Sequence, residues 1–107
     1  MPPVTPADIS LFVENGKFVF RLEVLSLYVY DRDTDGQPTC TAECARQWQP
    51  VIASDGSKPL GDWTLIERAD KSRQWRYRNR PLYTYIDEKP GQTLGHGRDG
   101  VWHLVVP

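Results

Sequence analysis

Two short aromatic segments repeat within the 107 residues of this chain, and they constrain its fold more than any other feature. Leu27–Asp33 reads Leu-Tyr-Val-Tyr-Asp-Arg-Asp, and Leu82–Asp87 reads Leu-Tyr-Thr-Tyr-Ile-Asp. Each segment leads through a loop-forming stretch to a tryptophan, Trp48 after the first and Trp102 after the second. A segment that returns with the same partners predicts a fold with an internal two-fold pseudo-repeat.

Most of the remaining sequence has the pattern of short β-strands. Apolar and polar residues alternate in these segments, which is typical of strands with one buried face. The turn formers Asn15 and Gly16 separate the first two and predict a hairpin there. The predicted strands are Ile9–Val13, Lys17–Val24, Leu27–Asp31, Trp63–Arg68, Arg73–Arg78, the segment at Leu82, and Val101–Val106.

One helix and one disulfide are expected between the two aromatic segments. Thr41–Trp48 has helical character and Pro50 stops it. The spacing Cys40-x-x-x-Cys44 matches neither a zinc motif nor a thioredoxin motif, so a disulfide is the favoured interpretation. Cβ atoms four residues apart in a regular helix are about 6 Å apart, which is too far for a bridge, so Cys40 must precede the helix. A redox-active pair is the alternative.

We therefore predict a mainly β fold, a single domain of about seven short antiparallel strands with an internal two-fold pseudo-repeat and one short helix. Residues 1–8 contain three prolines and are expected to form a flexible lead-in. The β-rich domain is expected to span 9–107, with the pseudo-repeats at about 25–52 and 80–107.

Charge and hydropathy exclude several classes of partner. The net charge is −1, which argues against nonspecific binding to nucleic acid or to an anionic membrane. The arginines between Arg73 and Arg80 alternate with aromatic residues, so we interpret them as a solvated strand face. No apolar run approaches the ~20 residues of a transmembrane helix, and the opening residues lack the features of a signal peptide. We expect a monomer.

The tyrosines of each aromatic segment lie two residues apart, so both rings share one face of a strand. That face is either part of the core, with tyrosine hydroxyls bonded to Asp33 or Asp87, or a groove that binds a ligand. The second copy is one residue shorter before its aspartate, so Asp87 need not act as Asp33 does. The candidate binding residues are Tyr28, Tyr30, Asp33, Tyr83, Tyr85, Asp87 and Trp102.

The acidic loop after the first segment resembles the first half of a calcium loop. Asp31, Asp33 and Asp35 alternate before Gly36, as in a loop of hard oxygen ligands. The bidentate glutamate is missing at the twelfth position and no helix precedes the loop, so an EF-hand is excluded. A solvated turn is favoured over a looser calcium site. The two histidines, His96 and His103, lack a third soft ligand, so metal binding there is less favoured.

Several motifs together resemble one known family. They are Leu27-Tyr-x-Tyr-x-x-Asp33, Cys40-x-x-x-Cys44-Ala-x-x-Trp48-x-Pro50, Gln74-x-x-Tyr77, Pro81-Leu-Tyr-x-Tyr, Pro90-Gly91 and Val101-Trp-His-x-Val-x-Pro107. Over residues 25–107 the chain resembles the secreted repeat of small bacterial lipoproteins with a Tyr-x-aromatic-x-x-Asp motif, a family without an established activity. The resemblance implies export to the periplasm or cell envelope, with the native signal or lipid anchor expected to lie outside this sequence.

The sequence motifs indicate a class of function but no specific reaction or ligand. The sequence contains no nucleophile elbow, zincin motif, phosphate loop or Rossmann fingerprint. We predict a non-enzymatic secreted or cell-envelope module that binds or has a structural role, without a cofactor, and whose partner is an envelope component or a small ligand. The alternative is a periplasmic metal-binding or redox accessory protein that uses the Asp31–Asp35 loop or the Cys40/Cys44 pair.

Overall fold

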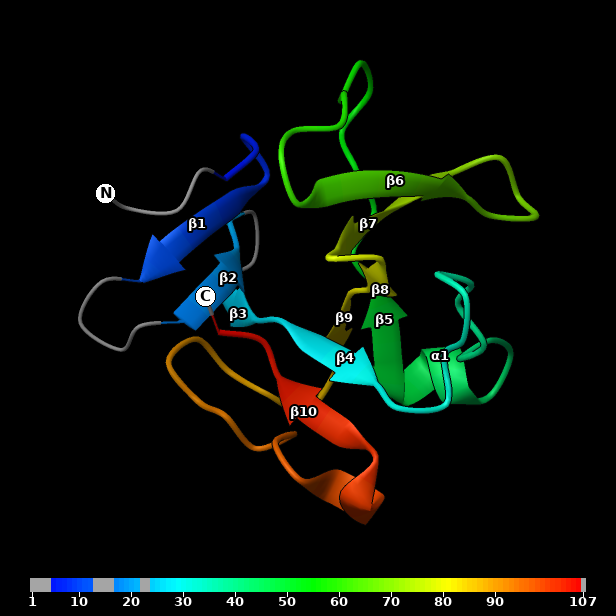
Figure 1. Cartoon of the computed structure of the whole chain (residues 1–107). Coiled ribbons are helices and arrows are strands. Elements are labelled where there is room, and N and C mark those ends of the chain that lie inside the picture. The colour runs from blue at the N-terminus through cyan, green and yellow to red at the C-terminus, as the bar shows by residue number, and fades with distance from the viewer. Residues whose placement is uncertain (1–4, 13–16, 22–23, 107) are drawn as a thin grey trace.

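The computed structural model describes residues 5–12, 17–21 and 24–106, and this part of the chain is mainly β (Figure 1). It contains ten strands in three antiparallel sheets, one short α-helix and one 3-10 turn, so the predicted fold class is confirmed, with more and shorter strands than expected. The elements are β1 (Ile9–Phe12), β2 (Lys17–Phe20), β3 (Leu25–Ser26), β4 (Tyr28–Tyr30), α1 (Cys44–Gln47), β5 (Trp48–Pro50), β6 (Trp63–Glu67), β7 (Arg73–Tyr77), β8 (Arg80–Pro81), β9 (Tyr83–Tyr85), η1 (Arg98–Gly100) and β10 (Trp102–Leu104).

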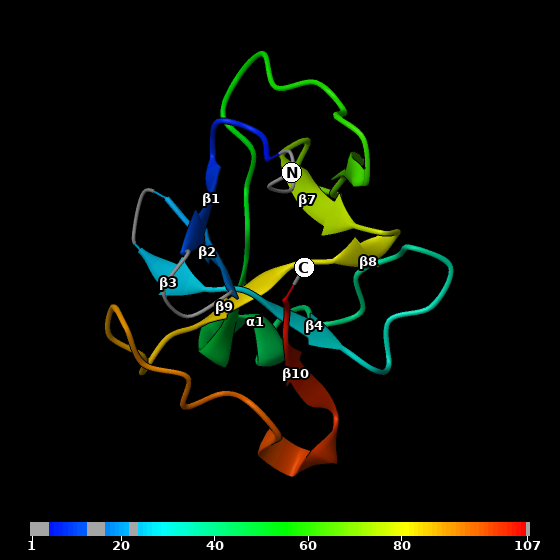
Figure 2. The same ribbon diagram turned by 60° about the vertical axis from the view of Figure 1, so that its left-hand side comes forward.

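The three sheets have the strand orders β1-β2-β3, β10-β4-β9-β5 and β6-β7-β8. Figures 1 and 2 show the first and third sheets on opposite sides of the molecule, with the four-stranded sheet below them. One face of the four-stranded sheet contributes Val29 to a core cluster that also contains Phe18, Trp63 and Trp75. The opposite face carries the repeated tyrosines and a second cluster. The four-stranded sheet therefore separates two cores.

Strand pairing in this sheet is symmetric about its centre. Tyr28 of β4 lies opposite Tyr83 of β9, which pairs the two aromatic segments. On the outer sides, Trp102 of β10 pairs with Tyr30, and Trp48 of β5 pairs with Tyr85. Each tryptophan strand thus lies beside the tyrosine strand of the other copy. The internal repeat is present, and its two copies exchange strands.

The strand predicted over Lys17–Val24 is shorter than expected. β2 ends at Phe20, and Val24 takes a positive φ of 55° in a turn before β3. Both faces of β2 are buried, so the prediction of one polar face is wrong. The reason is that Lys17 is only 3% exposed and its Nζ donates a hydrogen bond of 2.7 Å to Ser26 Oγ on the neighbouring strand. The predicted turn at Asn15 and Gly16 lies outside the described residues.

The helix is also shorter than predicted, and the disulfide is confirmed. α1 covers only Cys44–Gln47, because Ala42 has a positive φ of 53° and Trp48 already pairs as a strand. Cys40 precedes the helix as required, and its Cα lies 5.1 Å from that of Cys44 in the bridge. The predicted hairpin of β6 and β7 is confirmed over five residue pairs.

The described part of the predicted lead-in, residues 5–8, contacts the rest of the fold. Pro6 is buried, and the Asp8 carboxylate accepts hydrogen bonds of 2.9 Å from the backbone N–H of Ser54 and from Trp75 Nε1. Residues 6–8 are therefore attached to the fold by a buried ring and a carboxylate with several donors. Prolines alone did not indicate this, because the partners lie far along the chain.

Candidate functional site

Four aromatic rings form a continuous stack, called the aromatic stack below, on one face of the four-stranded sheet. The ring centroids of Tyr30 and Trp102 are 4.2 Å apart, those of Trp102 and Trp48 are 3.7 Å apart, and those of Trp48 and Tyr85 are 4.5 Å apart. The two tryptophan rings are nearly parallel, with 6° between their planes. Offset and stacked ring pairs of this kind add to the stabilisation that burial gives.

The face shared by the tyrosines is core. Tyr28 and Tyr83 are fully buried, and each packs edge-on against a tryptophan, Tyr28 on Trp48 and Tyr83 on Trp102. Within the aromatic stack only Tyr30 is half-buried. The predicted shared face is therefore present, but its rings do not form an open platform.

The buried tyrosine hydroxyls donate hydrogen bonds to carboxylates of the opposite copy. Tyr83 donates to Asp33 Oδ2 at 2.9 Å, as expected. Tyr28 donates to Glu88 Oε2 at 2.5 Å, whereas Asp87 is exposed. The partner expected at Asp87 is therefore Glu88.

The sequence did contain a signal for Glu88. Asp33 lies five positions after Tyr28, and Glu88 lies five positions after Tyr83. The spacing is thus kept between the copies while the acid changes type. Counting positions from the first tyrosine, instead of looking for a second aspartate, identifies the equivalent residue.

The surroundings of Asp33 satisfy both of its oxygens. Oδ1 accepts hydrogen bonds from the N–H and the O–H of Thr39, at 2.7 and 2.6 Å, and Oδ2 accepts the bond from Tyr83. Asp33 is half-buried, so water also reaches this site. Burial, and then the charge and hydrogen bond of Asp33, raise the pKa of Tyr83 well above its usual value.

The surroundings of Glu88 are different. Glu88 is 5% exposed, and its Oε2 accepts bonds from Tyr28 and from the N–H of Gly95 at 3.2 Å. Among the described residues its Oε1 is buried and has no hydrogen-bond partner. Burial, and then the hydrogen bond and charge of Glu88, raise the pKa of Tyr28 strongly. A second buried chain of hydrogen bonds runs nearby from Lys17 through Ser26 to the carbonyl of Gln92.

Gly95 is required by close packing. A Cβ at this position would lie 2.7 Å from Trp48 Cη2 and 3.0 Å from Tyr28 Cζ, both of which are ring atoms held in the core. Gly95 follows Glu88 by seven positions, as Cys40 follows Asp33. One copy thus has a glycine where the other has a disulfide-bonded cysteine.

The aspartates of the candidate calcium loop turn to different partners. Asp31 contacts His103 Nε2 at 2.7 Å and Arg80 at 3.2 Å, while the half-buried Asp33 accepts bonds from Thr39 and Tyr83, and Asp35 is exposed. The bond to His103 is the main cause that lowers the pKa of Asp31. No group of three or more His, Cys, Asp or Glu side chains in the described ranges is arranged to hold a metal ion. His96 accepts the backbone N–H of Leu104 on Nδ1.

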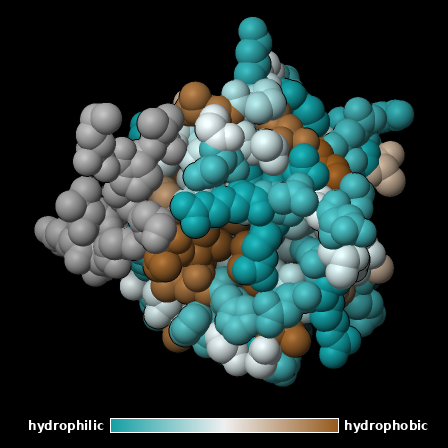
Figure 3. All heavy atoms as spheres, in the orientation of Figure 1, coloured by the Kyte–Doolittle hydropathy of each residue, from teal (hydrophilic) through white to brown (hydrophobic). Residues whose placement is uncertain are grey.

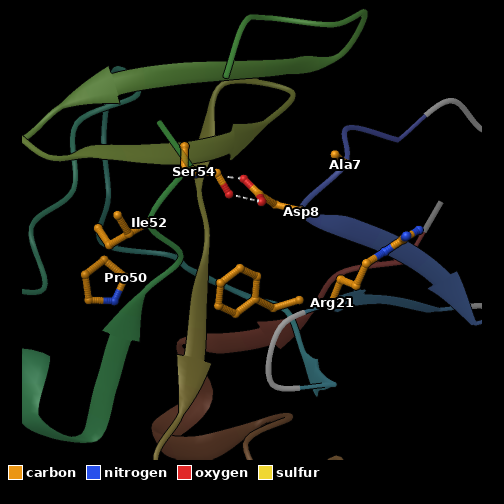
Figure 4. A pocket seen from close by; sticks show the side chains of 8 residues that line it. Ala7, Asp8, Arg21, Pro50, Ile52 and Ser54 are labelled. Atoms are coloured by element: carbon orange, nitrogen blue, oxygen red, sulfur yellow. Dashed lines mark hydrogen bonds between the residues drawn. The ribbon is translucent and has the colours of Figure 1, made fainter. Parts of the chain in front are cut away.

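A surface cavity of about 500 Å³ lies between the start of β1, the end of β2 and the chain after β5. Figure 4 shows Pro50 and Ile52 on one side, and Ala7, Asp8 and Arg21 on the other. Sequence patterns do not predict this cavity, because its walls come from three separate segments. Its lining residues are Ala7, Asp8, Phe20, Arg21, Pro50, Ile52, Ala53 and Ser54.

Asp8 forms the polar edge of the cavity. Partial burial acts to raise the pKa of Asp8, but hydrogen bonds from Ser54, Trp75 and Ser57 outweigh it and hold the pKa below its usual value. The carboxylate oxygens are thus already engaged with donors of the protein, and the rest of the wall is mainly apolar.

The fold and these sites define a small, mainly β, disulfide-bonded domain built from two interleaved repeats. Residues 64–106, from β6 to just beyond β10, match the model of a family described as a secreted repeat of unknown function. This match confirms the predicted resemblance over that segment, and the description as secreted agrees with an extracytoplasmic location. Neither the comparison with curated proteins nor that with solved structures gives a match. Within the described ranges, no helix has the length and apolar character needed to cross a membrane.

Proposed function

We propose that this chain is a non-enzymatic binding module of the periplasm or cell envelope that acts as a monomer and takes a small, mainly apolar ligand into the cavity beside Asp8. The aromatic stack has the role of a rigid scaffold. The observation that carries the proposal is the cavity itself, since about 500 Å³ lies within the range of about 300–1,000 Å³ that is typical of small-molecule sites.

The lining supports an apolar ligand. Phe20, Pro50 and Ile52 supply aromatic and aliphatic surface, and Ile52 is 37% exposed. The Asp8 carboxylate accepts hydrogen bonds from Ser54 and Trp75, so its oxygens are already occupied by donors of the protein. Figure 3 shows apolar surface near the middle of the face seen in Figure 1, with polar side chains over most of the rest of that face.

The other candidates have less support. Tyr28 and Tyr83 are fully buried, so a groove built on their rings would first have to open. Asp31 and Asp33 are bonded to different partners, so no observation favours a metal site in their loop. Cys40 is fully buried in its disulfide, so no observation favours a redox role for the cysteine pair.

The test is an amide NMR titration of the intact protein with indole and, separately, with octanol. We expect saturable shifts confined to residues around Phe20 and Pro50–Ser54. Ile52→Trp should fill the cavity and abolish these shifts, whereas Ile86→Trp places the same ring at another exposed isoleucine and should leave them unchanged. Shifts that spread over the surface, or that persist in Ile52→Trp, would contradict the cavity as the site.

A further inference from the structure

The aromatic stack is joined to two tyrosines that each have a proton acceptor in place. Trp48 and Trp102 lie at the centre, with ring centroids 3.7 Å apart. Tyr28 packs 5.5 Å from Trp48 and Tyr83 packs 5.3 Å from Trp102, measured between ring centroids. The hydroxyl of each tyrosine is hydrogen-bonded to a carboxylate.

Packing alone does not require a carboxylate at each tyrosine hydroxyl, but the oxidation of tyrosine does require a proton acceptor there. A phenol that loses one electron becomes a strong acid, so tyrosine is oxidised readily only when a nearby base takes its proton at the same time. Burial raises the pKa of Tyr28, so the phenolate is not available near neutral pH and the electron must leave together with the proton. The carboxylate of Glu88, 2.5 Å away, is placed to receive that proton.

We propose that this cluster is a sink for one-electron oxidants, a function separate from ligand binding in the cavity. A small oxidising radical takes one electron at the half-buried Tyr30 edge of the aromatic stack and leaves a radical cation on the tryptophan pair. Tyr28 then gives one electron to Trp48 and its hydroxyl proton to Glu88 Oε2. The products are a neutral tyrosyl radical, a protonated Glu88 and restored tryptophans, so electrons and protons balance.

The Glu88 side is the better acceptor of the two. Glu88 is 5% exposed, so the proton it receives is held away from water, and its second oxygen is not committed to another donor of the described residues. Asp33 already accepts two bonds from Thr39 and is half-buried. The structure assigns Tyr28 as the main site of the radical and Tyr83 as the secondary one.

The molecule contains its own control. Tyr77 packs 4.6 Å from Trp63 in the other core, again between ring centroids, and no carboxylate of the described residues accepts a hydrogen bond from Tyr77. A tryptophan beside a tyrosine is thus present in both cores, but among the described residues a carboxylate bonded to the tyrosine hydroxyl is present in only one. Tyr77→Phe should leave the transfer unchanged.

The experiment is flash-quench oxidation of the full chain by ruthenium(III) tris-bipyridine, with transient absorption of tryptophanyl and tyrosyl radicals. In the wild type the tryptophanyl signal should decay as the tyrosyl signal rises, more slowly in deuterated water. Tyr28→Phe should lose most of the tyrosyl signal, and Glu88→Gln should lose it while every ring remains. Near-ultraviolet circular dichroism checks the fold; if Glu88→Gln is unfolded, Tyr28→Phe and the isotope effect decide. An unchanged tyrosyl signal in Tyr28→Phe, or no isotope effect, would overturn the proposal.

Discussion

The two acid–tyrosine pairs occupy equivalent positions in the repeats, yet their surroundings differ. Asp33 is half-buried, has donors on both oxygens and lies next to a loop closed by the Cys40–Cys44 disulfide. Glu88 is almost fully buried, has one oxygen without a partner among the described residues, and lies next to a loop that packs through Gly95. The strand pairing is therefore symmetric between the two copies, whereas the loops beside the acids differ.

The difference shows which constraint acts on each half. An acid must reach the tyrosine of the other copy, because a buried hydroxyl without a partner destabilises the fold. That requirement fixes the position five residues after the first tyrosine but leaves the type of acid free. The loop that covers the pair is held by a covalent bond in one copy and by close packing in the other, and both solutions keep the core covered.

The largest expected effect comes from removing one acid at a time. Glu88→Ala leaves the Tyr28 hydroxyl buried without an acceptor and leaves the Gly95 N–H with only its 3.3 Å bond to the Tyr28 oxygen, and we expect it to lower the free energy of unfolding by about 3 kcal/mol. Asp33→Ala frees the Thr39 donors and the Tyr83 hydroxyl, but Asp33 is half-buried and water can take the place of its carboxylate, so about 1 kcal/mol is expected. Urea unfolding of both variants measures this, and equal losses would remove the distinction between the two halves.

A smaller effect is expected from opening the disulfide. Cys40→Ala with Cys44→Ala frees a five-residue loop, for which chain entropy predicts a loss of about 2 kcal/mol. Amide exchange in residues 34–43 should then approach the rate found in residues 89–94, because the covalent difference between the copies is gone. Reductant serves as the control, since it should destabilise the wild type and leave the double variant unchanged. Slow exchange that persists in the double variant would show that the loop is held by other contacts.

The smallest effect should appear in alkaline solution. The pKa of Tyr28 is raised in the folded state, so above the unfolded pKa of about 10 only the unfolded chain loses this proton. The free energy of unfolding is therefore unaffected below about pH 10 and falls above it, by about 1.4 kcal/mol per pH unit for each buried tyrosine with a raised pKa. Tyr28→Phe should flatten the loss measured by urea unfolding above about pH 10. Tyr30→Phe, which changes a half-buried ring, is the control and should keep the wild-type slope. If the free energy of unfolding of Tyr28→Phe fell with pH as steeply as that of the wild type, the Tyr28 hydroxyl would not be the source of the pH dependence.

Local patterns predicted the parts of the fold whose partners are close in sequence. The β6–β7 hairpin and the Cys40–Cys44 bridge follow from turn residues and from the reach of a side chain, and both are present. The helix was overestimated because apolar spacing does not show that Trp48 has a strand partner in Tyr85. Alternation puts Lys17 on a polar face, and it cannot show that Lys17 is buried, because the acceptor Ser26 lies on a strand of only two residues.

Among the candidate sites, too, the features that follow from local sequence were predictable and those that depend on distant segments were not. The tyrosine faces and the Tyr83–Asp33 bond were predictable from alternation and from the need of a buried hydroxyl for a partner. Glu88 does not follow from the residue type, because the equivalent acid in the other copy is an aspartate, and only the spacing of five positions from the first tyrosine indicates it. The cavity beside Asp8 was beyond sequence reasoning, since Asp8, Ser54 and Trp75 meet only through tertiary packing.

The exchange of strands between the copies also sets the order in which the polypeptide can complete its structure. β10 must reach β4, more than seventy positions earlier, before the central sheet has its outer strand. Contacts of such long range slow folding. Residues 28–104 must therefore all be available before the tyrosine core can close, so neither repeat can complete this core by itself.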